Sequence, residues 1–174
     1  MVREIVIYPD KRLKLISKKV EVFDEKIHAL LDDMYDTMIA KNGVGLAAIQ
    51  IGVDLRALII NIPLEEADAE HNQPKENTLE MINPAIIEMD GSTHFQEGCL
   101  SVPGVYEDVN RAKHVKVEYQ DRFGNTHIIE DDDFLAIAMQ HEIDHLEGRV
   151  FVEKLSYTKR KKFEKEWKRR SKPA

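Results

Sequence analysis

Two histidines lie four residues apart in the segment AMQHEIDHLEG (138–148), and a glutamate directly follows the first of them. On a helix this spacing turns His141 and His145 to one face, and Glu142 lies beside them. Two imidazoles with an adjacent carboxylate form the H-E-x-x-H pattern, a metal-ligand pair with a neighbouring general base. The pattern therefore predicts a catalytic metal, and it leaves open which residue is the third protein ligand.

Apolar residues occupy the same helical face as the two histidines. Phe134, Ile137 and Ala138 precede them at helical spacing. We therefore expect the imidazoles on the inward side, where neutral imidazoles need partners and a metal would provide one.

Three candidates exist for a third ligand. Phe151 stands where one class of metalloprotease carries its third histidine, so that class is excluded. Glu164 and Glu166 lie in a strongly basic segment with no supporting motif, which disfavours them. A lone cysteine is more often an inert buried residue, but Cys99 lies in the constrained segment QEGCLSVPG (96–104). A Cys/His/His set would leave a fourth position to water, as a catalytic metal requires.

A third segment, GVGLAAIQIG (43–52), combines two glycines, small residues and a glutamine. It matches neither a dinucleotide fingerprint nor a phosphate-binding loop. Alone, it is typical of a glycine-permitted entry into a buried strand. Gln50 indicates more than a structural role for this segment, because a polar side-chain amide in an apolar stretch needs a hydrogen-bond partner or a function.

The segments GVGLAAIQ, EGCLS and HEIDH, in this order and at these separations, resemble the three motifs of the peptide deformylases. The resemblance covers most of the chain. It departs from the family pattern only at Ile49, a variable position, and in a longer loop at 63–79. It implies hydrolysis of the N-formyl group from the formyl-methionine of nascent polypeptides, with release of formate.

The resemblance also implies a metal centre. Cys99, His141 and His145 would bind one divalent ion, which is Fe(II) in many members of the family and is replaceable by Zn, Ni or Co. Glu142 would take a proton from water and deliver it to the departing amine.

Substrate contacts follow from the same resemblance. Gln50 and the backbone N–H of Leu100 would stabilise the developing oxyanion. Backbone groups of Val44, Gly45 and 103–106 would pair with the peptide as an added strand. The methionine pocket would be lined by Val44, Phe134, Ile137 and Ala138.

Two other readings remain from the residues alone. A small zinc peptidase could use the same helix, and it would cleave ordinary amide bonds. A non-catalytic domain could use a metal or hydrogen bonds only to join the helix to EGCLS. The second reading leaves Glu142 and Gln50 without a role.

Periodicity and turn signals predict the elements that position these groups. Asp24 is expected to cap a helix that NG (42–43) ends, and Gly148 to stop the H-E-x-x-H helix. The other predicted elements are strands at 55–62 and 80–89, a hairpin through 115–130 and a helix at 157–170. We predict one α+β catalytic domain over 1–174, with mostly antiparallel sheets packed around a central H-E-x-x-H helix.

Charge divides the chain unevenly. Residues 154–174 hold ten Lys and Arg against Glu164 and Glu166, whereas the whole chain has a net charge of −7. A basic C-terminal helix could therefore meet a polyanion, and the resemblance implies the ribosome. The N-terminal segment does not read as a signal peptide, and no apolar run is long enough to span a bilayer. We therefore expect a cytoplasmic location, with neither a membrane nor DNA as a partner.

Overall fold

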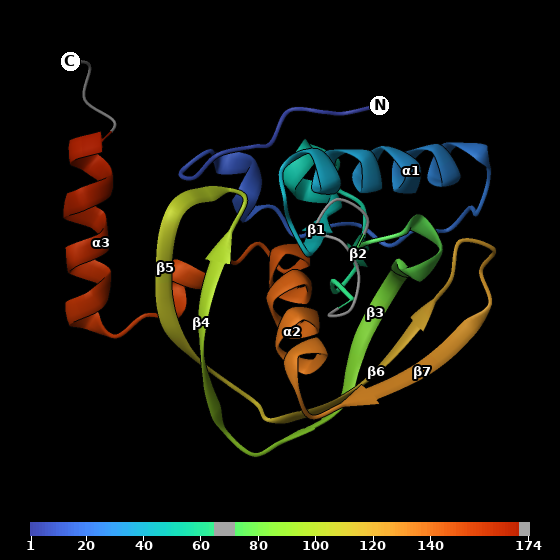
Figure 1. Cartoon of the computed structure of the whole chain (residues 1–174). Helices are drawn as coiled ribbons and strands as arrows, with labels where there is room; N and C mark the ends of the chain where they lie inside the picture. The colour runs from blue at the N-terminus through green and yellow to red at the C-terminus, as the bar shows by residue number, and fades with distance from the viewer. Residues whose placement is uncertain (65–71, 171–174) are drawn as a thin grey trace.

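The computed structural model describes residues 1–64 and 72–170. Within these residues the chain forms three α-helices, seven β-strands and four short 3-10 helices (Figure 1). The helices and strands are α1 (Glu25–Ala40), β1 (Gly45–Ala47), β2 (Ala57–Ile60), β3 (Leu79–Asp90), β4 (Thr93–Cys99), β5 (Val102–Arg111), β6 (His114–Gln120), β7 (Thr126–Asp131), α2 (Phe134–Leu146) and α3 (Tyr157–Arg170). The 3-10 helices are η1 (Lys11–Lys14), η2 (Ala48–Ile51), η3 (Lys75–Asn77) and η4 (Phe151–Lys154).

The strands form two separate antiparallel sheets. One has five strands in the order β1-β2-β3-β6-β7, and the other is the β4–β5 pair. Helix α2 lies between the two sheets in Figure 1 and contacts β1, β2 and β7. The predicted α+β class with antiparallel sheets is confirmed.

Helix α1 begins and ends as its sequence predicts. The Asp24 carboxylate accepts hydrogen bonds from the backbone N–H groups of Lys26 and Ile27, as an N-terminal cap should. Its apolar positions are buried, and Leu31 and Met34 are fully inaccessible. Asn42, with φ of 58°, turns the chain out of the helix toward β1.

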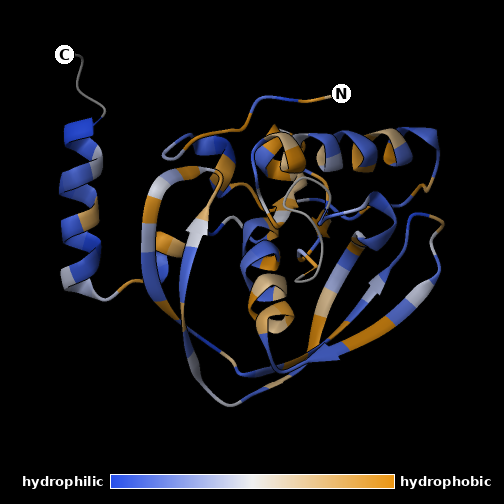
Figure 2. Cartoon of the chain, viewed as in Figure 1, coloured by the Kyte–Doolittle hydropathy of each residue, from blue (hydrophilic) through white to orange (hydrophobic). Residues whose placement is uncertain are grey.

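The core has three apolar clusters, and they include both faces of the five-stranded sheet. One lies under α1, a second lies between the sheet and α2, and a third joins β5, η4 and α3. In Figure 2, α3 is mostly hydrophilic, whereas α2 and the strands carry both hydrophobic and hydrophilic residues. Helix α3 is held on one side by Phe163, which is buried, and by Trp167, whose Nε1–H donates to the Tyr8 carbonyl at 3.1 Å.

Two segments differ from the sequence-based expectation. The constrained segment QEGCLSVPG was not expected to form regular strands, but Gln96–Cys99 completes β4 and Val102 begins β5. A shift in pairing between Glu97 and Cys99 explains the irregular pattern that hid the strand. The loop predicted at 63–79 lies partly outside the described residues, and its described part contains η3. Among the described helices, none is long and apolar enough to cross a bilayer.

Candidate active site

Three ligand atoms converge where α2 meets the end of β4. His145 Nε2 lies 3.3 Å from His141 Nε2 and 3.4 Å from Cys99 Sγ. The three ligand atoms all lie within 4.8 Å of one another. Helix α2 supplies both imidazoles from one face, and the β4–β5 turn brings the thiol to them.

This arrangement fits a metal ion. Metal–nitrogen and metal–sulfur bonds of about 2.0–2.3 Å in a tetrahedral site place neighbouring ligand atoms roughly 3.3–3.6 Å apart. The two observed separations of 3.3 and 3.4 Å match that spacing. His145 is fully buried, and its Nδ1 has no hydrogen-bond partner among the described residues. A thiol and two imidazoles suit a borderline divalent ion.

A buried carboxylate orients one of the imidazoles. His141 Nδ1 lies 2.8 Å from Glu97 Oε1, so the Nδ1–H donates to the carboxylate and leaves Nε2 free to bind a metal. Arg111 donates to both oxygens of Glu97, each at 2.7 Å, and to Asp144 Oδ2 at 2.6 Å. The Arg111 and Glu97 side chains are 3% and 4% exposed, so these charges are paired out of solvent.

These contacts set the ionisation of the group. Burial alone would raise the pKa of Glu97, but hydrogen bonds from Arg111 and His141 lower it to about 2. Burial opposes a charge on His141, yet the hydrogen bonds with Cys99 and Glu97 raise its pKa well above the usual value. Burial and the neighbouring His141 hold the pKa of His145 well below the usual value. Without a bound metal, these shifts favour a neutral His145 ring and a charged His141 ring beside the ionised Glu97, so a metal that binds His141 Nε2 would displace a proton there.

Glu142 is a buried carboxyl group beside the ligand cluster. It is 4% exposed, its Oε1 lies 3.9 Å from His145 Nε2, and that oxygen has no hydrogen-bond partner among the described residues. Burial raises its pKa to about 7. Gly45 makes this position possible, because a Cβ at Gly45 would lie only 2.6 Å from Glu142 Oε2. A carboxyl group with this pKa can both accept and donate a proton near neutral pH.

Gln50 reaches the cluster from η2. Its Oε1 accepts a hydrogen bond from the Ala47 N–H at 2.9 Å, which turns the amide nitrogen toward β4 and β5. That nitrogen donates to Ser101 Oγ at 3.1 Å and lies 3.4 Å from Cys99 Sγ. The fully buried amide is thus satisfied and holds an N–H donor beside Cys99 of the candidate ligand cluster.

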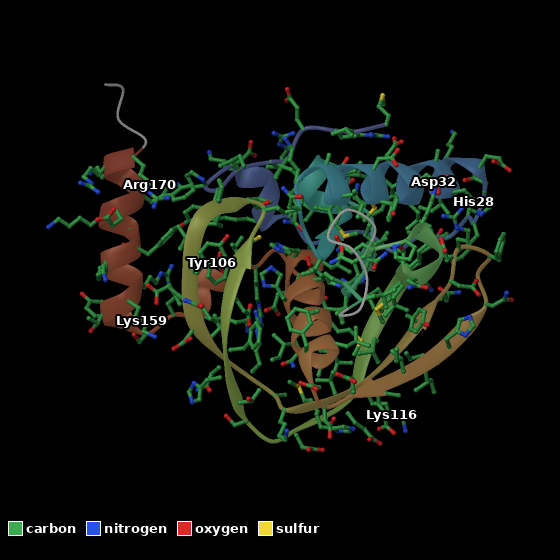
Figure 3. The ribbon with its side chains drawn as sticks, viewed as in Figure 1. His28, Asp32, Tyr106, Lys116, Lys159 and Arg170 are labelled. Carbon is green, nitrogen blue, oxygen red and sulfur yellow. The ribbon has the colours of Figure 1, made fainter. Side chains whose placement is uncertain are left out.

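A cleft of about 900 Å³ opens above these groups. It runs between the Gly43–Gly45 segment and the 103–106 segment, and Tyr106 lies on the β4–β5 side (Figure 3). The predicted site residues that line it are Val44, Gly45, Gln50, Cys99, Leu100, Phe134, Ile137, Ala138, His141 and Glu142. His145 is buried behind them.

The structure adds residues that the sequence analysis missed. Glu97 and Arg111 support His141, and Ser101 accepts a hydrogen bond from Gln50. Glu97 directly precedes the Gly-Cys pair in the sequence. Its role in orienting His141 depends on the pairing of β4 with β5, which brings Arg111 to its carboxylate. His28 does not join the site: its ring bonds the Arg122 carbonyl, and Figure 3 places it on α1, away from α2.

Two imidazoles, a thiol and a buried carboxyl group of raised pKa in an open cleft define the site of a metal-dependent hydrolase. The polypeptide deformylase family model matches residues 2–161. The chain is 58% identical to the peptide deformylase of Helicobacter pylori strain G27 over 165 residues, which cover 95% of this chain and 92% of that one. It is 55% identical to the peptide deformylase of Nautilia profundicola over 168 residues, covering 97% and 94% of the two chains.

A solved structure agrees with this match. The peptide deformylase of Ehrlichia chaffeensis in complex with actinonin superposes with a TM-score of 0.87 at 42% identity, and the match covers 99% of each chain. The chain therefore belongs to the polypeptide deformylase family. It is a hydrolase that removes N-formyl groups from peptides, and the family uses a divalent metal.

Proposed function

We propose that the H-E-x-x-H helix and the end of β4 together bind one divalent ion through Cys99, His141 and His145. Fe(II) is the ion we assign to the native centre, with Zn, Ni or Co able to replace it. The observation that carries the proposal is the convergence of the three ligand atoms beside Glu142 in an open cleft. When bound, the ion would supply a Lewis acid that polarises the formyl carbonyl and lowers the pKa of water.

Glu142 is assigned the proton transfer. Burial raises its pKa to about 7, so the group can accept and release a proton near neutral pH. It takes the proton of the attacking water and returns it to the amine that leaves as the C–N bond breaks. Formate and a free α-amino group are the products.

Gln50 and Leu100 are assigned the stabilisation of the oxyanion. The Gln50 amide nitrogen faces the ligand cluster, and Leu100 directly follows Cys99 on the cleft wall. Hydrogen-bond donors fixed before the reaction stabilise the charge that develops on the formyl oxygen. Loss of one such donor typically raises the barrier by about 3 kcal/mol.

The peptide would bind along the open edge of β1. Gly45 pairs with Ile60, and the Asn61 N–H donates to the Val44 carbonyl, so the Gly45 N–H and C=O point away from β2. Because β1 is an edge strand, an extended peptide can continue the sheet there, with 103–106 of β5 on its other side.

The formyl-methionine side chain would enter the apolar part of the cleft. Ile137 and Ala138 are nearly buried and lie one helical turn before the histidines, beside Phe134. Val44 closes this pocket from the opposite wall. The methionine pocket therefore adjoins the proposed metal position.

The wider assignments are also proposals. We place catalysis in a single domain over 1–174, acting in the cytoplasm on nascent chains, and we assign α3 a role in docking to the ribosome. The outward basic face of α3 supports the last assignment, because Lys161, Lys165, Lys168 and Arg169 are exposed while Phe163 is buried.

Formate release from a formyl-Met tripeptide by protein purified without oxygen, with metal analysis of the same sample, tests the proposal. We expect about one ion per chain, and Cys99→Ala should lose metal as severely as His141→Ala. Full metal occupancy in Cys99→Ala would remove the thiolate from the ligand set. Cleavage of the internal amide bonds of an unformylated peptide would favour a zinc peptidase.

A further inference from the structure

The segment that contains Gln73 supports one wall of the cleft through hydrogen bonds. We propose that Gln73 is a positioning residue for peptide substrates, because its amide holds the Gly43–Val44 rim in the place where the peptide backbone binds. This inference rests on the proposed function of that rim as a peptide-binding edge. Gln73 contacts neither the three proposed ligands nor Glu142.

The amide of Gln73 bridges two carbonyl groups at the end of the β1–β2 ladder. Its Nε2 donates to the Gly43 carbonyl at 3.0 Å and to the Asn61 carbonyl at 2.8 Å. The last backbone contact between the two strands runs from the Asn61 N–H to the Val44 carbonyl at 2.8 Å. Beyond this last backbone hydrogen bond, the Gln73 amide links the two chain segments by binding the carbonyls of Gly43 and Asn61.

This position needs a group that can donate two hydrogen bonds from one atom. Two carbonyl oxygens that face the same space repel each other, and each requires a donor. A primary amide places two N–H bonds on one uncharged nitrogen, so it satisfies both oxygens without bringing a charge into a partly buried site. Loss of the amide would leave both carbonyls without this partner and would weaken the bridge.

Gln73 is itself held in place from two directions. The Tyr35 hydroxyl of α1 donates to the Gln73 carbonyl at 2.7 Å. The Asn61 side chain donates to the Pro74 carbonyl at 3.0 Å and to Thr78 Oγ1 at 2.9 Å. The segment is therefore tied to both α1 and β2, so its amide points at the rim in a fixed orientation.

The rim that Gln73 holds packs against the opposite part of the site. A Cβ at Gly43 would lie 2.8 Å from Leu100 Cδ1, so backbone and side chain are in close contact there. The Gly43 N–H donates to the Met38 carbonyl at the end of α1 at 2.9 Å. With its N–H and C=O both engaged, Gly43 fixes the start of β1 and hence the direction of Val44 and Gly45. Loosening it would disturb peptide binding more than the chemistry at the metal.

Gln73→Met tests this assignment, because it keeps the length of the side chain and removes both donors. We would measure kcat, KM and metal content with a formyl-Met tripeptide and with formyl-methionine, which has no peptide backbone beyond its first residue. We expect KM for the tripeptide to rise about tenfold, the effect of roughly 1.4 kcal/mol. The kcat, the metal content and the KM for formyl-methionine should stay within about twofold.

Lys75→Met is the matched control in the same segment. Lys75 pairs with Asp32 at 3.1 Å and lies over the Tyr35 ring, but it does not contact the rim. Its loss should leave KM for both substrates unchanged. Equal losses in the two variants, or a Gln73→Met effect equal on both substrates, would reduce Gln73 to a residue that only stabilises the segment.

Tyr35→Phe is a milder variant in case Gln73→Met does not fold. It removes only the hydroxyl that orients Gln73, so KM for the tripeptide should rise about twofold to threefold while formyl-methionine is unaffected. An unchanged KM for the tripeptide in a folded Gln73→Met protein would overturn the proposal, and so would an unchanged KM in a folded Tyr35→Phe protein if Gln73→Met does not fold. Failure of the wild-type protein to release formate would instead refute the proposed function.

Discussion

Helices α2 and α3 both carry ionisable side chains, but those compared on α2 are buried and those on α3 are exposed to solvent. In α2, Glu142 is 4% exposed, and burial raises its pKa to about 7. In α3, the Glu164 side chain is 43% exposed and lies 3.3 Å from Arg160 in an ion pair on the surface. A carboxylate on a helix becomes chemically distinctive only where packing removes water from it.

The same contrast applies to the cations of the two regions. Arg111, which pairs with Asp144 of α2, is 3% exposed and bonded to two carboxylates. Arg169 of α3 is 76% exposed and contacts Glu166 of its own helix at 3.0 Å. Because water competes for the second pair and not for the first, we expect substitutions around α2 to have much larger effects than those in α3.

The largest effect is expected from Glu142→Gln. The substitution keeps the volume and removes the proton-transferring group, so turnover of a formyl-Met tripeptide should fall by about a hundredfold or more. Metal content should be retained, because the residue is not one of the proposed ligands. Stopped assays of formate release with parallel metal analysis would measure both, and near-normal turnover would refute the assigned role.

The next largest effect is expected from Arg111→Met. It leaves the buried carboxylate of Glu97 without its guanidinium partner, whereas Asp144, which is 18% exposed, keeps Lys154 at 3.5 Å. Loss of the partner of a buried charge should lower the free energy of unfolding by about 3 kcal/mol. Urea unfolding would measure the change, and Arg169→Met on α3 is the matched control, with an expected change below about 0.5 kcal/mol. Similar losses in the two variants would mean that burial does not separate the two regions.

A smaller and salt-dependent effect is expected on the outer face of α3. Neutralising Lys161, Lys165, Lys168 and Arg169 to glutamine should weaken co-sedimentation with ribosomes at low salt, because fewer counterions are released from RNA phosphates. Hydrolysis of short formyl peptides should be unchanged. This variant spares Phe163 and Trp167, whose contacts a truncation of the helix would remove.

The control for that experiment neutralises an equal number of exposed lysines on the body of the protein, at positions 18, 19, 26 and 113. This variant should bind ribosomes as the wild type does. If the wild type fails to sediment at low salt, or if both variants lose binding equally, α3 has no special docking role.

The smallest effect is expected from Glu164→Gln. It removes an exposed ion pair with Arg160, so the free energy of unfolding should change by less than about 0.5 kcal/mol and turnover should not change. Compared with Glu142→Gln, it applies the same chemical change to the exposed helix. A measurable loss of turnover would show that α3 contributes to the site.

Local spacing was enough to predict much of the fold and the composition of the site. The i, i+3, i+4 pattern placed Phe134, Ile137 and Ala138 on the histidine face, and the structure lines the cleft with all three. The cap at Asp24 and the β6–β7 hairpin are likewise confirmed. These features depend on residues close together in the chain, so helical and strand periodicity reveals them.

Contacts between distant segments were beyond such reasoning. Nothing in the order of residues indicates that Arg111 of β5 would link Glu97 of β4 to Asp144 of α2, or that Gln73 would bridge Gly43 and Asn61. The same holds for the pairing shift between Glu97 and Cys99 that makes EGC part of a strand.

Residue order alone therefore indicated the proposed ligand types, the helix that carries two of them and the neighbouring carboxylate. The family resemblance leads us to expect Cys99 beside the histidines, but only tertiary packing brings the three side chains together, removes water from Glu142 so that its pKa rises to about 7, and ties one imidazole to a charged Glu97. The physical reason is that burial and charge pairing depend on which surfaces of α2, β4 and β5 come together. Spacing along one segment carries no information about those partners.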